Sequence, residues 1–224
     1  MLDDHPILLA VLTGFISGLL TSIPVGPVNL SIIHEGSRRG FRWALLIGMG
    51  AISMELLYCA IAFTGFAAFF QKGLVKAAME LTSFVFLLFL GVKFLTARAI
   101  ESTNKIEERI EQKLHPHSAF MTGFVRVMGN PGVLIFWTIL AANFISREWV
   151  EPTRSSRFAC VCGVACGAGL WFTSLSYVVS LRHQKISEKT LLRLERFSGV
   201  ALLVLALLHG ANIVREMVRH SHRL

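Results

Sequence analysis

The stretch Ser22-Ile23-Pro24-Val25-Gly26-Pro27-Val28-Asn29 lies inside an apolar run, residues 7–33, that carries no charged residue. Proline has no N–H group for the carbonyl four residues back, so Pro24 and Pro27 leave the carbonyls of Leu20 and Ile23 without helical partners. In hydrocarbon an unpaired carbonyl costs several kcal/mol, so such a break must face protein or a wet cavity. Breaks of this kind form the binding sites of membrane transporters. The alternative is a plain kink that fits a neighbouring helix.

The composition is that of a membrane protein. Of the 224 residues, 54% are hydrophobic and only 16% are charged, whereas ordinary globular domains carry about 25% charged residues. The charges are confined to short segments between long apolar runs, which predicts a polytopic membrane protein. The net charge of +8 then reports topology rather than a nucleic-acid partner, because cytoplasmic loops of membrane proteins are rich in Lys and Arg.

Six apolar runs approach the length of about 20 residues that a helix needs to cross a bilayer. They cover approximately 7–33, 43–70, 81–97, 119–145, 158–181 and 197–214. We therefore expect an all-α fold with six transmembrane helices in a single domain, residues 1–224. The connections after the first, third and fifth runs carry more Lys and Arg than the other side, which predicts that both termini lie outside, in the periplasm.

The two halves of the chain share a pattern. Thr13-Gly14-Phe15 precedes the first break, and Thr122-Gly123-Phe124 precedes a second one at Gly129-Asn130-Pro131-Gly132. Pro131 is expected to free the carbonyl of Val127. Three spans in each half place the halves in opposite orientations, as in the inverted repeats of transporters. The sequence therefore predicts a 3+3 inverted repeat with broken helices 1 and 4.

The repeat halves are expected at about residues 1–97 and 118–218. The segment between them, 98–117, has Ile106, Ile110 and Leu114 at helical spacing. We interpret it as an amphipathic cytoplasmic loop that lies on the membrane surface.

Charged residues within the spans are candidates for function. Glu55 lies near the middle of the second span, where a carboxylate costs roughly 2.5–3.5 kcal/mol on insertion scales. We interpret it as a proton carrier; the alternative is a neutral, hydrogen-bonded structural group. Arg126 either snorkels to the cytoplasmic surface or faces the cavity as a counter-charge, and the sequence does not separate the two. His34 and Glu35 are close enough to the first break to line its inner mouth.

No enzyme or metal site is predicted. The four cysteines lie in apolar runs and form neither a C-x-x-C pair nor a paired zinc motif. Cys162 and Cys166 share a helix face and are interpreted as small packing residues, with a thiol relay as the alternative. No nucleophile–base pair is apparent.

With these residues in view, the chain resembles the LysE/RhtB family of bacterial amino-acid exporters over nearly its whole length. The resemblance is carried by four motifs: Pro24-Val25-Gly26-Pro27-Val28-Asn29, Ser37-Arg38-Arg39-Gly40, Gly48-Met49-Gly50 with Glu55, and Asn130-Pro131. They resemble the family's Pro-Gly-Pro-Asn signature, Arg-Gly turn, Gly-x-x-x-Gly-Asp second span and Asn-Pro. The chain departs from the pattern at Val25 and Val28, at Glu55 in place of Asp, and at His34-Glu35, where a polar or basic pair is usual.

The resemblance implies a secondary transporter of the bacterial inner membrane that exports amino acids or related metabolites, coupled to the proton gradient. A divalent-cation or other ion exporter is the alternative, but it needs several converging carboxylates or histidines, and the spans offer only Glu55 and His209.

The expected partners are a small-molecule substrate and the lipid bilayer. No nucleic acid, cofactor or metal is expected, and the sequence leaves open whether the chain forms a homo-oligomer. The residues expected to bind substrate are Pro24, Gly26, Pro27, Asn29, Asn130 and Pro131, with Glu55 for proton coupling and Arg126, His34 and Glu35 as gates or counter-charges.

Overall fold

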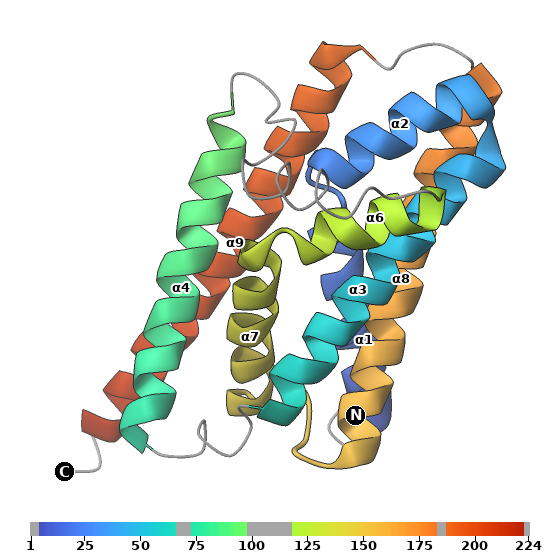
Figure 1. The fold of residues 1–224 in the computed structure, drawn as a ribbon. Coiled ribbons are helices and arrows are strands. Elements are labelled where there is room, and N and C mark those ends of the chain that lie inside the picture. The colour runs from blue at the N-terminus through green and yellow to red at the C-terminus, as the bar shows by residue number, and fades with distance from the viewer. Residues whose placement is uncertain (1–4, 66–72, 98–117, 183–186, 222–224) are drawn as a thin grey trace.

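The computed structural model describes residues 5–65, 73–97, 118–182 and 187–221, and in these ranges the only regular elements are helices (Figure 1). They are α1 (Pro6–Ser22), α2 (Pro27–Arg39), α3 (Phe41–Gly65), α4 (Gly73–Leu95), α6 (Ala119–Met128), α7 (Pro131–Ser146), α8 (Arg154–Arg182) and α9 (Glu188–Ser221). The predicted amphipathic segment 98–117 and the side chain of His209 lie outside what the structure describes.

The predicted apolar runs correspond to these helices. Helices α3, α8 and α9 are each long and apolar enough to cross a membrane, and α4 is a helix of 23 residues. The helices of the pairs α1–α2 and α6–α7 are long enough to cross a membrane only when each pair is counted as one span. The bend at the break is 71° in α1–α2 and 68° in α6–α7. The expectation of a polytopic all-α membrane protein with a broken first and fourth span is confirmed.

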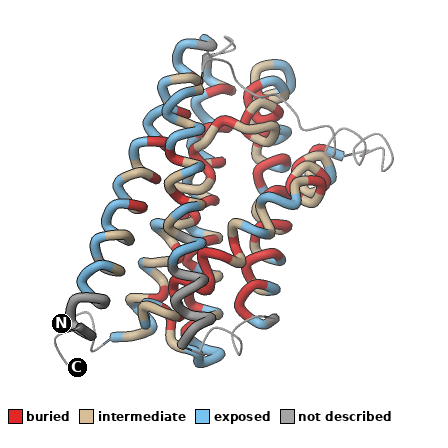
Figure 2. The backbone as a smooth tube through the Cα atoms, turned by 90° about the vertical axis from the view of Figure 1, so that its left-hand side faces the viewer, coloured by how far each residue is buried: buried red, intermediate tan, exposed pale blue. Residues whose placement is uncertain are grey.

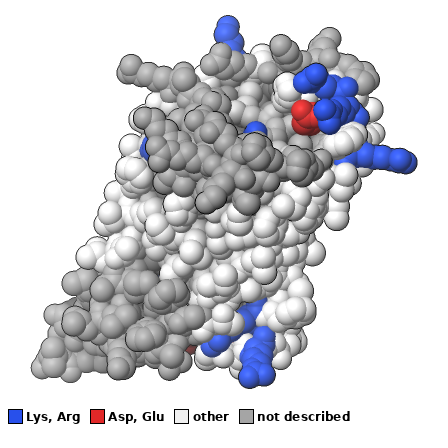
Figure 3. Space-filling view, in the orientation of Figure 1, with Lys and Arg blue, Asp and Glu red and all other residues white. Residues whose placement is uncertain are grey.

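The distribution of charge agrees with this arrangement. On the face shown in Figure 3, Lys and Arg gather at the upper and lower ends of the molecule, and the surface between them is uncharged where it is described. Figure 2 shows that the buried residues lie on the inward faces of the helices, while the outward faces are exposed. Many of these exposed side chains are large and apolar, among them Ile16, Leu170 and Leu207, as expected of helices that face lipid.

The basic segment after the first break is helical rather than a turn. The resemblance implied a turn at Ser37-Arg38-Arg39-Gly40, but α2 continues through Arg39, and only Gly40, with φ +86°, turns the chain into α3. No residue between Val28 and Arg39 is a proline, so nothing stops the helix earlier. Glycine adopts this positive φ without the penalty that other residues meet. Arg38 and Arg39 lie in the last turn, where basic side chains favour the helix dipole.

Two helix crossings bring backbones into close contact through glycine. Where α1 packs on α8, a Cβ atom on Gly14 would lie 2.0 Å from the carbonyl oxygen of Cys160, and one on Gly163 would lie 2.2 Å from that of Val11. Where α3 packs on α6, a Cβ atom on Gly123 would lie 1.9 Å from the carbonyl oxygen of Ile47. Membrane bundles use small residues in this way because they allow close van der Waals packing.

The two crossings use equivalent positions. A Cβ atom on Gly163 would meet Val11 and Phe15, and one on Gly50 would meet Phe120 and Phe124. Each of these pairs flanks the glycine of a Thr-Gly-Phe tripeptide, at residues 13–15 and 122–124. The contact between a broken helix and the helix that crosses it therefore occurs twice, and each half of the chain supplies the broken helix once.

Helices α4 and α9 form a third close pair, which lies at the left of Figure 1. A Cβ atom on Gly199 of α9 would lie 2.5 Å from the backbone nitrogen of Leu95. One on Gly91 of α4 would lie 2.7 Å from a side-chain carbon of Leu203. This pair closes one side of the space into which the two breaks open.

Candidate functional site

A cavity of about 820 Å³ lies between the two breaks, and each of the eight described helices contributes to its wall. Its lining includes the break at Pro24–Pro27, the break at Asn130, and aromatic and aliphatic side chains of α4 and α7. A largely apolar pocket of a few hundred to about 1,000 Å³ with a few polar groups is typical of small-molecule sites. Four charged side chains line the cavity: Glu55, Lys93, Arg126 and Glu195.

The first break is closed by the side chain of Asn29. Its Nδ2 atom donates to the carbonyl oxygens of Ser22, at 2.9 Å, and Pro24, at 2.6 Å. Its Oδ1 atom accepts a hydrogen bond from Nε1 of Trp171 on α8, at 3.1 Å. Asn29 is buried and lines the cavity, but both of its N–H donors are used by the backbone of the break.

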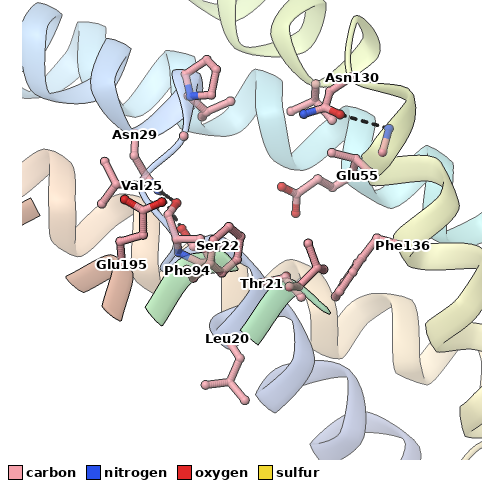
Figure 4. A pocket seen from close by; sticks show the side chains of 18 of the residues that line it. Leu20, Thr21, Ser22, Val25, Asn29, Glu55, Phe94, Asn130, Phe136 and Glu195 are labelled. Atoms are coloured by element: carbon pink, nitrogen blue, oxygen red, sulfur yellow. Dashed lines mark hydrogen bonds between the residues drawn. The ribbon is translucent and has the colours of Figure 1, made fainter. Parts of the chain in front are cut away.

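The second break is closed differently from the prediction. The carbonyl of Val127 is not free, because it accepts a hydrogen bond from the backbone N–H of Asn130, at 3.1 Å. The side chain of Asn130 caps α7 by accepting from the N–H of Gly132, at 3.0 Å (Figure 4). The chain tightens to a three-residue turn at the end of α6. The carbonyl of Met128 would bond to the N–H of Gly132 in a continuous helix, but that N–H is given to Asn130. The Met128 carbonyl accepts a hydrogen bond from the hydroxyl group of Tyr58, at 3.0 Å.

Glu55 points into the cavity from α3, on the side of Asn130 (Figure 4). The residue is 9% exposed. Its Oε2 atom is buried, and within the part of the chain that the structure describes no hydrogen bond reaches that atom. A carboxyl group in this position faces whatever occupies the cavity.

Arg126 lies at the cavity wall, so the structure favours the cavity over the surface for this side chain. Its Nη1 atom donates to the carbonyl oxygen of Pro27, at 2.9 Å, and also contacts Oγ of Ser31. Both partners belong to the first turns of α2. The guanidinium group therefore adds a positive charge beside the N-terminus of α2.

Three predicted residues are not among those that line the cavity. Pro131 starts α7, and its neighbours Asn130 and Gly132 contribute instead. His34 and Glu35 lie farther along α2, where Glu35 pairs with Arg39 at 3.1 Å and with His34 at 3.2 Å. The structure therefore gives these two residues a place on the basic end of α2 and does not bring them to the mouth of the break.

Two charged residues of the cavity were missed from sequence. Lys93 falls within the third predicted run, 81–97, and was not considered a candidate, and the sixth predicted run began only at residue 197. Helix α9 begins at Glu188, so Glu195 is two turns inside it, 7% exposed, and lies across the cavity from Glu55 (Figure 4). Two signals in the sequence could have identified Glu195. The first is helical spacing, because the buried residues of this segment are Leu191, Glu195, Ser198 and Leu202. The second is Ser187, which caps the start of α9 by accepting a hydrogen bond from the N–H of Thr190.

Among the described residues, no three His, Cys, Asp or Glu side chains come together as a metal-binding group. The charged side chains of the cavity thus comprise two acids and two bases from four different helices.

Several known proteins that are similar to this chain are named as efflux or export proteins. The family model for LysE type translocators matches residues 19–211. A putative amino acid efflux protein, YcgF, of Bacillus subtilis (strain 168) is 26% identical over 212 residues, which cover 92% of this chain and 98% of the relative. The arginine exporter protein ArgO of Salmonella typhimurium (strain LT2) is 24% identical over 211 residues, 94% of this chain and 96% of the relative. No solved structure matches the chain.

Proposed function

The chain belongs to the LysE type translocator family, and from this premise we propose that it exports amino acids as a secondary transporter. It is a multi-pass membrane protein. Its relatives of matching length are named as a putative amino acid efflux protein and an arginine exporter. The proposal includes the bacterial inner membrane, periplasmic termini, and two halves, about 1–97 and 118–218, related as an inverted repeat. The repeated glycine crossings support this last point.

The observation that carries the proposal is the charge balance of the cavity between the two breaks. Glu55 and Glu195 contribute carboxyl groups to its wall, and Arg126 and Lys93 contribute basic groups. A free amino acid is a zwitterion with one group of each sign. Charged groups at membrane depth are costly and mark functional sites, and a substrate that carries both signs can contact carboxyl and basic groups of the same cavity.

The arrangement suggests an orientation for the substrate. Arg126 and the N-terminus of α2 lie together at the wall, and a helix N-terminus carries a partial positive charge that favours anions. Transporters aim such half-helix ends at the carboxylates of their substrates. We place the substrate carboxylate at this point, and its ammonium group toward Glu55 and Glu195. Pro24, Gly26 and Pro27 contribute backbone to the same wall.

Glu55 is the proposed proton carrier. Its buried Oε2 atom has no hydrogen-bond partner among the described residues, so protonation of that atom breaks no bond within this part of the protein. In the proposed cycle, export of one substrate is exchanged for entry of protons. Both the pH gradient and the membrane potential then drive outward flow, because each inward elementary charge gains about 2.3 kcal/mol per 100 mV.

The proposal is tested with purified protein in liposomes. We would load the vesicles with single radiolabelled amino acids, impose a pH gradient and a potential separately, and measure efflux against vesicles without protein. We expect efflux of one chemical class of amino acid, accelerated when protons are driven in the opposite direction.

Two results would change this reading. If efflux occurs but neither gradient alters its rate, amino-acid transport stands and proton coupling is lost. If no amino acid moves, amino-acid export is wrong, and the same vesicles loaded with divalent cations test the alternative of an ion exporter.

A further inference from the structure

We propose that Tyr58 and Trp171 are a matched pair of positioning residues, each of which fixes the backbone of one of the two breaks that line the cavity. Neither residue was singled out by a motif. Tyr58 lies on α3 and Trp171 on α8, and each hydrogen-bonds to the broken helix of the opposite half of the chain. Their effect on transport rests on the proposed function, whereas their effect on the breaks does not.

Tyr58 acts directly on the second break. Pro131 has no N–H, and the N–H of Gly132 is given to Oδ1 of Asn130, so the carbonyl of Met128 has lost the backbone donors that a continuous helix would supply. The hydroxyl group of Tyr58 donates to this carbonyl at 3.0 Å, and Tyr58 is 8% exposed. Because an unpaired carbonyl is costly away from water, the hydroxyl group stabilises α6 at the point where it ends.

Trp171 acts on the first break through Asn29. The two N–H donors of the Asn29 amide hold the carbonyls of Ser22 and Pro24. This arrangement needs the amide in one orientation, with Oδ1 directed away from the break. The indole N–H of Trp171 is a donor only, and it binds Oδ1 at 3.1 Å. It therefore selects the orientation in which Asn29 closes the break.

The two residues occupy equivalent positions. Tyr58 follows Gly50, and Trp171 follows Gly163, by the same number of residues. These are the glycines at which α3 crosses α6 and α8 crosses α1. The geometry that places one aromatic donor against one break thus also places the other donor against the other break, which is why the two are expected to act as a pair.

The test measures amide hydrogen exchange at each break separately. We would compare the wild type with Tyr58→Phe and Trp171→Phe in lipid nanodiscs, and follow peptides that cover residues 22–31 and 126–133. Tyr177→Phe is the matched control, because Tyr177 lies on α8 and is exposed. Loss of one typical hydrogen bond predicts about fivefold faster exchange at the break concerned. Tyr58→Phe should accelerate only 126–133, Trp171→Phe only 22–31, and Tyr177→Phe neither.

A double-mutant cycle tests the indirect route of Trp171. If Trp171 acts through Asn29, then Trp171→Phe adds no further change at 22–31 in an Asn29→Ala background. If Asn29→Ala does not yield folded protein, the single variants decide the proposal. A general structural role would accelerate both peptides in both variants, and that result would overturn the proposal, as would unchanged exchange at both breaks.

Transport measurements on the same variants test whether the backbone of the breaks affects binding of substrate in the cavity. We expect Tyr58→Phe and Trp171→Phe each to raise KM for the exported amino acid about fivefold while the maximal rate changes less, because the breaks form the cavity wall. If exchange responds as expected but the wild type moves no amino acid, the proposed function fails and the positioning roles stand. If the wild type transports and exchange does not respond, only the positioning roles fail.

Discussion

The Nη1 atom of Arg126, in the last turn of α6, lies 2.9 Å from the carbonyl oxygen of Pro27, the first residue of α2. The same atom contacts Oγ of Ser31. One guanidinium group therefore joins the helix that precedes the second break to the helix that follows the first. The positive charge of the cavity wall is held in place by groups that are nearly 100 residues away in sequence.

Replacement of Arg126 by Lys should impair transport although the charge is kept. The planar guanidinium group can contact two acceptors at once, whereas an ammonium group on a flexible stem holds neither in a fixed geometry. We expect Arg126→Lys to raise KM about tenfold, which corresponds to about 1.4 kcal/mol. Initial efflux rates over a range of substrate concentrations measure this. Arg38→Lys, at an exposed position of α2, should leave KM unchanged, and equal effects of both changes would contradict the role of Arg126.

Replacement of Glu55 by Gln should separate transport from its driving force. The substitution keeps the size of the side chain and removes the group that can gain or lose a proton. We expect efflux driven by a pH gradient to fall at least tenfold, while exchange of labelled for unlabelled amino acid across the membrane continues. Glu148→Gln, at an exposed position between α7 and α8, is the control. Persistence of the pH response in Glu55→Gln would make Glu55 a structural residue.

Replacement of Glu195 by Gln should change which amino acids are preferred. The cavity then loses one of its two carboxyl groups, so attraction for positively charged side chains weakens. We expect KM to rise about tenfold for amino acids with a cationic side chain and less for neutral ones, again on the scale of about 1.4 kcal/mol. Competition between labelled and unlabelled amino acids measures the preference. An equal change for all substrates would show that Glu195 acts on the fold and not on recognition.

Substitutions at the glycine crossings should destabilise the bundle. A Cβ atom on Gly123 would lie 1.9 Å from the carbonyl oxygen of Ile47, a backbone atom that cannot move aside alone. Overpacking of this kind typically costs about 1–3 kcal/mol, so Gly123→Ala should lower Tm measurably in detergent. Gly169→Ala is the control, because no atom of a neighbouring helix lies within 4 Å of the added Cβ atom. Equal Tm values for the two variants would show that the helices separate easily at this crossing.

Much of the fold follows from local chemistry that is visible in the chain itself. Pro24, Pro27 and Pro131 lack an N–H group wherever they stand, so both breaks were predictable from sequence. Apolar runs of membrane-spanning length predicted the helices, and the position of Glu55 in the middle of such a run marked it as a candidate residue. These features depend on one residue and its near neighbours.

Features that depend on distant partners were decided only by packing. The carbonyl of Val127 is not left open at the second break, because a tight turn gives it the N–H of Asn130. The carbonyl of Met128 is closed instead by Tyr58, 70 residues away in sequence. Glu195 reached the cavity only because α9 starts earlier than its apolar run and packs on α4. Whether a polar group is satisfied by backbone, side chain or substrate depends on which helices meet, and sequence spacing alone does not contain that information.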